Sequence, residues 1–117
     1  MKIENPEIFK LHAEYCKTLA SPKRLMILAM LAVREMSVGE MAEAMGVPLA
    51  NVSQHLTVLK SHNIVRVRKE GQTVYYSLVD ARVTDACVLI RSLLLDNLKQ
   101  RGLMAEQIGG QDALTGG

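Results

Sequence analysis

A run of polar side chains between residues 51 and 62 has the residue types that bind nucleic acid. Apolar Val52, Leu56 and Leu59 recur in this run at helical spacing, so its polar residues share the opposite face of one helix. Such a helix can enter the major groove of duplex DNA, where the amide of Gln54 can pair bidentately with adenine. The other side chains that we expect to contact bases or phosphates are Asn51, Ser53, His55, Thr57 and Lys60.

A group of cations follows directly, in a segment that alternates between apolar and polar side chains. Residues 64–68 alternate in this way, as do residues 73–78, and Glu70-Gly71 is the expected turn of a β-hairpin between them. Positive charge on a hairpin suits contact with the DNA backbone, which fixes register and carries little sequence information. A charged cluster is often only a solvated surface, but its place beside the polar helix favours DNA. The expected contacts from this hairpin are Arg66, Arg68, Lys69 and Gln72.

The elements that position these groups follow from apolar spacing and from helix-capping residues. One helix is expected over residues 6–20, and a second, apolar nearly all round and therefore buried, begins after the N-cap Ser21. A short third helix opens with the capping box Ser-x-x-Glu at Ser37 and stops at Gly46. A tight turn joins it to the polar helix, which makes the pair a helix-turn-helix.

A last helix is expected after Asp80, which we predict to be its cap. Its apolar side chains form a stripe wider than one small domain needs, so part of the stripe is expected to meet a second copy of the chain. The predicted fold is therefore mainly α with a small β-hairpin wing: a winged helix-turn-helix with four helices, two strands and a fifth helix. The stripe comprises Val83, Cys87, Ile90 and Leu94, with Ala86, Leu89 and Leu93 beside it.

Length and composition predict one small domain. The chain has 117 residues, of which 49% are hydrophobic, 22% charged and only 3% aromatic, a balance that favours packed helices. We expect a DNA-binding and dimerisation domain over residues 1–108 and a disordered, Gly-rich tail over residues 109–117. The longest apolar run is too short to span a membrane and no secretory signal is evident, so we expect a cytoplasmic protein with reduced thiols.

The order of these elements resembles the ArsR/SmtB family of bacterial winged-helix repressors. The similarity rests on residues 19–28 (Leu-Ala-Ser-Pro-Lys-Arg-Leu-Met-Ile-Leu), on Val-Ser-Gln-His-Leu-x-x-Leu at residues 52–59, and on Gly-x-x-x-Tyr-Tyr-Ser-Leu at residues 71–78. With the last helix it covers roughly residues 8–100. It implies a homodimer, paired through its first and last helices, that binds a palindromic operator and leaves it when an effector binds.

The two metal sites that the resemblance implies are not preserved in this chain. One family site needs a Cys-x-Cys pair at the start of the third helix, where this chain has Ser37 and Gly39. The other needs Asp and His ligands on the last helix and two more ligands about three turns on. Its matching positions here are Asp80, Arg82, Leu93 and Asp96, a set with a cation and an apolar side chain among the ligands.

Cys16 and Cys87 remain as candidates for effector chemistry. The family's dimer interface would bring the first and last helices together, so oxidation or a sulfur-bridged link between the two thiols could shift one helix against the other. Family members with such a switch place their first cysteine near Ala29 of this sequence, so the correspondence is incomplete. Two alternatives stay open: the thiols are core filler, or His12, Cys16 and Cys87 bind a soft metal or metalloid with one further ligand.

Two other function classes fit the sequence less well. An enzyme would need a nucleophile and base at a recognisable spacing or a Gly-rich phosphate loop, and we find neither, so we expect no catalysis and no cofactor. A winged helix can also serve purely in protein–protein contact. The basic hairpin and the polar helix face favour DNA over that alternative.

Overall fold

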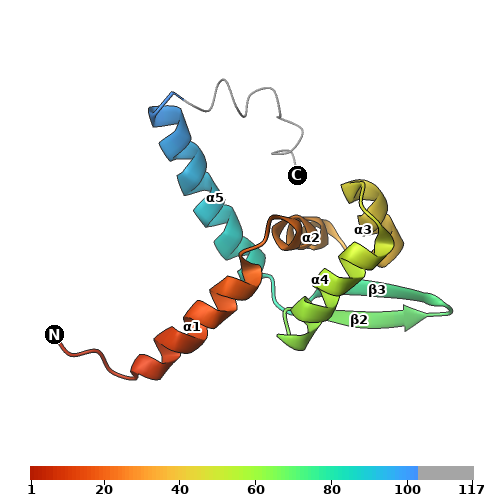
Figure 1. The fold of residues 1–117 in the computed structure, drawn as a ribbon, viewed down its shortest axis with the longest axis horizontal. Helices are drawn as coiled ribbons and strands as arrows, with labels where there is room; N and C mark the ends of the chain where they lie inside the picture. Colours follow the sequence, from red (N-terminus) through yellow and green to blue (C-terminus); the bar gives the residue numbers. More distant parts are fainter. Residues whose placement is uncertain (103–117) are drawn as a thin grey trace. The chain divides into compact units, whose positions relative to one another are not determined.

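The computed structural model describes residues 1–102 and divides the chain into two units, with the boundary between Val79 and Asp80. Within these described residues, the predicted winged helix-turn-helix with five helices is confirmed (Figure 1). The predicted domain end at residue 108 and the predicted tail over residues 109–117 lie outside the described residues. The first unit contains α1 (Pro6–Leu19), α2 (Pro22–Val33), β1 (Met36–Ser37), α3 (Val38–Met45), α4 (Leu49–Ser61), β2 (Val65–Glu70) and β3 (Thr73–Leu78), and the second contains α5 (Arg82–Gln100).

Helix α2 begins as its capping residue predicts, but it is not buried all round. The Ser21 hydroxyl accepts a hydrogen bond from the Arg24 backbone N–H at 3.4 Å, and proline is the first helical residue. One side of the helix enters the core, where Ile27 is fully buried. On the other side Met26 and Val33 are 49% and 79% exposed in the single chain, so the prediction of an all-round buried helix is wrong. Apolar composition alone does not define which sides of a helix are covered.

The helix-turn-helix forms where the sequence predicts it. The Glu40 backbone N–H donates to the Ser37 hydroxyl at 3.2 Å, and the Ser37 N–H donates to the Glu40 carboxylate at 3.0 Å, so the capping box is complete. Gly46 ends α3 in the left-handed conformation with φ of 67°, which a side chain would disfavour. Helix α4 then packs on α2, α3 and β2. The apolar side chains buried in this core are Ile27, Leu28, Leu31, Met41, Ala42, Val52, Leu56, Leu59, Ile64 and Val65.

The wing is a three-stranded antiparallel sheet in the order β1-β3-β2, one strand more than the sequence predicted. The short β1 pairs with β3, with Met36 opposite Tyr76. The β2–β3 hairpin has Glu70 paired with Thr73, so its turn is Gly71-Gln72 and lies one residue later than predicted. Gly71 has φ of 62° and therefore occupies the turn position that requires a left-handed backbone. Figure 1 shows this hairpin extending from the helices of its unit.

Helix α5 begins one residue after the position predicted for its start. Ala81, without a side-chain cap, occupies the N-cap position, and Asp80 precedes it. The Asp80 carboxylate nevertheless accepts from the Arg82 N–H at 2.9 Å, so it serves the first turn from outside the helix. No helix in residues 1–102 is long and apolar enough to cross a membrane.

Candidate nucleic-acid interface

Helix α4 presents a polar face to solvent, opposite its buried stripe. Gln54, Thr57 and Lys60 are exposed, at spacings that place them along one side of the helix, and Ser53 is half-buried beside them. The Thr57 hydroxyl donates to the Ser53 carbonyl at 2.9 Å, which leaves its oxygen as an acceptor. Neither Gln54 nor Lys60 has a side-chain hydrogen bond or ion pair with another described residue. Both side chains are therefore available to a ligand.

Asn51, predicted to contact phosphate from the first turn of α4, is less available. The residue is half-buried, and its Oδ1 atom is buried without a hydrogen-bond partner. Among the described residues that are not exposed, no other buried side-chain oxygen or nitrogen lacks a partner. Leaving a buried carbonyl oxygen without a hydrogen bond costs free energy. Its amide nitrogen is the atom left for a phosphate oxygen.

His55 lies on the edge of the polar face and is held from α2. Arg24 donates from Nε to His55 Nδ1 at 3.1 Å and from Nη1 to the Thr18 carbonyl at 3.0 Å. Burial, followed by the nearby charges of Arg24 and Lys23, lowers the pKa of His55. The imidazole is therefore a neutral group at physiological pH.

Three of the four wing side chains predicted to contact DNA are exposed and are not paired with a carboxylate of the described residues. Arg66, Lys69 and Gln72 are exposed, and neither cation forms an ion pair with any residue in the described part of the chain. Arg66 makes one long hydrogen bond, from Nη2 to the Leu78 carbonyl at 3.4 Å. Because side chains alternate along β2, Arg66 and Lys69 lie on opposite faces of the hairpin.

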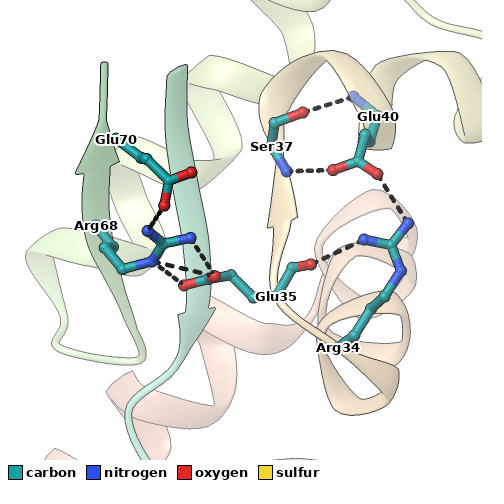
Figure 2. Close-up of polar contacts among 6 residues, drawn as sticks. All are labelled: Arg34, Glu35, Ser37, Glu40, Arg68 and Glu70. Atoms are coloured by element: carbon teal, nitrogen blue, oxygen red, sulfur yellow. Dashed lines mark hydrogen bonds and ion pairs between the residues drawn. The ribbon is translucent and has the colours of Figure 1, made fainter. Parts of the chain in front are cut away.

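Arg68, the fourth predicted contact, is instead neutralised within the protein. Figure 2 shows its guanidinium between two carboxylates: Nη2 lies 2.8 Å from Glu35 Oε1, and Nη1 lies 2.6 Å from Glu70 Oε1. Nε donates to Glu35 as well, at 3.1 Å, and Cζ lies 4.8 Å from the Tyr75 ring centroid. The hydrogen bonds that Arg68 donates lower the pKa of Glu35, and donating to Glu35 and Glu70 raises the pKa of Arg68. Its charge is offset on the free protein.

Glu35 connects the wing to the start of α3. Arg34 donates to the Glu35 carbonyl at 3.0 Å and pairs with Glu40 at 2.8 Å, the same carboxylate that completes the Ser37 capping box (Figure 2). The hydrogen bond from Arg34, followed by that from the Ser37 backbone, lowers the pKa of Glu40. Sequence reasoning missed Glu35 because its partner Arg68 is 33 residues away and no local pattern joins them.

The two cysteines are free thiols in separate units. Cys16 is exposed on α1 and Cys87 is half-buried on α5. His12 is exposed one turn before Cys16. No group of three or more His, Cys, Asp or Glu side chains that could hold a metal ion is found in residues 1–102. The roles of Cys16 and Cys87 as a switch, or of His12, Cys16 and Cys87 as metal ligands, stay predictions.

Comparison with known proteins identifies the family. A helix-turn-helix domain model matches residues 19–68. The HTH-type transcriptional regulator Rv0081 of Mycobacterium tuberculosis is 34% identical over 114 residues, covering 97% of this chain and 100% of the relative. The SmtB repressor homologue of Synechocystis is 40% identical over 83 residues, covering 67% and 63% of the two chains. The chain belongs to the ArsR/SmtB family.

Solved structures of similar proteins have the same fold. The crystal structure of Rv0081 superposes with a TM-score of 0.73 at 35% identity, covering 85% of this chain and 98% of that one. The solution structure of the Mycobacterium bovis protein Mb0332, described as a homodimeric winged helix-turn-helix DNA-binding domain, gives a TM-score of 0.71 at 31% identity and covers 84% and 93%. This ArsR/SmtB protein is thus a transcriptional regulator, in a family of DNA-binding proteins rather than enzymes.

Proposed function

We propose that this protein is a dimeric repressor that binds double-stranded operator DNA and releases it when an effector acts. The observation that carries the proposal is the exposed polar face of α4, with Gln54 and Lys60 unengaged, in a helix that its buried side holds firmly to the core. We assign base reading to Gln54, with Ser53 and Thr57 contacting bases or phosphate. Lys60 and the amide of Asn51 contact phosphate.

The wing supplies sequence-independent contacts in this proposal. Arg66, Lys69 and Gln72 are exposed and reach the DNA backbone or the minor groove. Arg68 contributes its charge mainly when it exchanges its carboxylate partners for phosphate, since it already forms ion pairs with Glu35 and Glu70. The charge available to DNA is therefore smaller than the count of basic residues in the wing indicates.

A homodimer is proposed because both terminal helices carry exposed apolar side chains. On α1 these are Ile8, Phe9 and Leu11, each at least half exposed in the single chain. Several exposed apolar side chains on one helix favour a protein-binding face, and the homodimeric description of Mb0332 supports a second copy as the occupant. The corresponding exposed side chains of α5 are Val88, Leu89, Ile90, Leu93 and Leu94.

A gel-shift titration tests DNA binding directly. The DNA upstream of the protein's own gene is compared with a scrambled duplex of equal length, and sedimentation gives the oligomeric state of the free protein. We expect a dimer that prefers the upstream DNA and loses it as salt rises. A protein that shifts neither duplex would instead be a protein-interaction module.

For the effector, we propose chemistry at Cys16 and Cys87, oxidation or reaction with sulfur species, in a cytoplasmic protein. Support comes from the two free thiols and the exposure of Cys16. Operator affinity is measured for reduced protein and for protein treated with oxidant or persulfide, with Cys16→Ser and Cys87→Ser as matched variants. We expect the treatment to weaken operator binding by the wild type. Each of the two substitutions should make operator binding insensitive to the treatment. Absence of a Cys16–Cys87 link by mass spectrometry after treatment would rule out the two-thiol switch.

A further inference from the structure

Arg24 connects three helices of the first unit through one guanidinium. It lies in the first turn of α2 and is half-buried. Its Nη1 donates to the Thr18 carbonyl near the end of α1, and its Nε donates to His55 Nδ1 on α4. The Thr18 carbonyl belongs to the backbone of α1 and His55 is half-buried on α4, so the two hydrogen bonds give the guanidinium a defined position.

The bond to His55 decides where the imidazole proton resides. A guanidinium has donors only and does not lose its proton in proteins, so Nδ1 must accept and cannot carry hydrogen. A neutral imidazole has one N–H, which is therefore on Nε2. Arg24 thereby selects the Nε2–H tautomer of His55 and excludes the doubly protonated ring, in which Nδ1 would be a donor facing a donor.

The remaining nitrogen of His55 is open to a ligand. His55 Nε2 has no hydrogen-bond partner among the described residues, and it is not among their buried unpaired atoms. The charged groups that face the ring, Arg24 and Lys23, both lie on α2 and disfavour a further positive charge. His55 sits one residue after Gln54, at the border of the polar face of α4.

We propose that Arg24 is a positioning residue of the DNA-binding surface, which fixes His55 as a neutral Nε2–H donor to a phosphate oxygen of the duplex. The proposal rests on the proposed function. In this proposal His55 contributes differently from the cations of the site, because a neutral donor adds a hydrogen bond without releasing a counterion. Loss of the imidazole should therefore weaken binding at every salt concentration and leave the salt dependence unchanged.

The first experiment needs no DNA. Nitrogen-15 NMR of the histidine side chains in the free, full-length protein reports the tautomer and the pKa of each ring, and His55→Gln identifies the His55 signals. We expect the Nε2–H tautomer for His55 in the wild type. In Arg24→Met both tautomers are expected and the pKa of His55 rises, whereas Lys23→Gln, which removes a neighbouring charge, keeps the tautomer.

The second experiment measures affinity for the upstream duplex across a salt series. His55→Phe is expected to bind about tenfold more weakly, as for one hydrogen bond lost in each protomer of a dimer, with the wild-type salt slope. Arg24→Met should lose less affinity, about twofold, because part of its His55 population still carries the proton on Nε2. His55→Gln, whose amide nitrogen can replace Nε2–H, and Arg24→Lys, which keeps a donor for Nδ1, should restore most of that affinity. Circular dichroism melting checks that each variant is folded.

The outcomes separate this inference from the proposed function. A His55 tautomer that is unchanged in folded Arg24→Met overturns the positioning role, whatever happens with DNA. A fixed tautomer together with wild-type affinity in His55→Phe overturns the donor role. A wild type that binds no duplex overturns the proposed function and the donor role together, while the tautomer result still tests the Arg24–His55 relation.

Discussion

Glu35→Gln is expected to strengthen DNA binding, because it removes a carboxylate that competes with phosphate for Arg68. In the free protein one guanidinium faces two carboxylates, Glu35 and Glu70, so the cluster has a net charge of −1. Glutamine keeps the size of the side chain, but its uncharged amide oxygen accepts from Arg68 without the attraction between opposite charges. The cluster then becomes neutral, with Glu70 as its remaining anion, and Arg68 can turn to the DNA backbone.

The size of the effect follows from counterion release. Each phosphate contact adds about 0.9 to the slope of log affinity against log salt. A dimer that gains one contact per protomer therefore steepens by about 1.8. Between about 50 and 200 mM salt, the affinity of the variant should fall by roughly 12-fold more than that of the wild type, with the gain in affinity greatest at low salt.

The assay is fluorescence anisotropy of a labelled upstream duplex over that salt range. Glu43→Gln is the matched control: it makes the same charge change at an exposed position of α3, where no ion pair is formed with a described residue. Binding by Glu35→Gln that equals that of Glu43→Gln at every salt concentration would refute the competition between Glu35 and phosphate. Equal melting temperatures would exclude a folding effect.

Three further predictions test other parts of the site and fold. Gln54→Ala should reduce discrimination at one base pair by about 1–3 kcal/mol while leaving the salt slope unchanged, as measured on duplexes substituted at each position. Ser37→Ala should lower the free energy of unfolding by about 1 kcal/mol in urea titrations, because an α3 N–H loses its cap. Asp80, with a pKa held at about 2 by hydrogen bonds from the Arg82 side chain and backbone, contributes stability that is full above its ordinary pKa of 3.8 and is lost as the pH falls toward 2. Asp80→Asn should remove that part of the acid dependence of the urea midpoint.

The helix-turn-helix could be predicted from sequence because its signals are local. The Ser37–Glu40 capping box spans one turn, Gly46 marks a left-handed residue at a helix end, and the buried stripe of α4 repeats at helical spacing. Each of these depends on residues within about a turn or two of one another. The polar face of α4 followed as the complement of the stripe.

The contacts that define the site more closely are not local and were missed. Glu35 meets Arg68 across 33 residues, and Arg24 meets His55 across 31. A two-residue strand such as β1 has too few residues for alternation to appear, so the third strand was also unpredictable. As a result, sequence reasoning identified the basic residues of the wing but not which of their charges are already neutralised.

The salt dependence of wild-type binding to the upstream duplex tests the central claim most directly. Lys60, Arg66 and Lys69 are exposed and free of ion pairs with the described residues, which gives six phosphate contacts for a dimer and a slope of about −5. We expect affinity to fall about 10³-fold between about 50 and 200 mM salt, with the upstream sequence preferred over a scrambled duplex throughout. A slope near zero, or equal affinity for both duplexes, would contradict the assignment of α4 and the wing as an operator-binding surface.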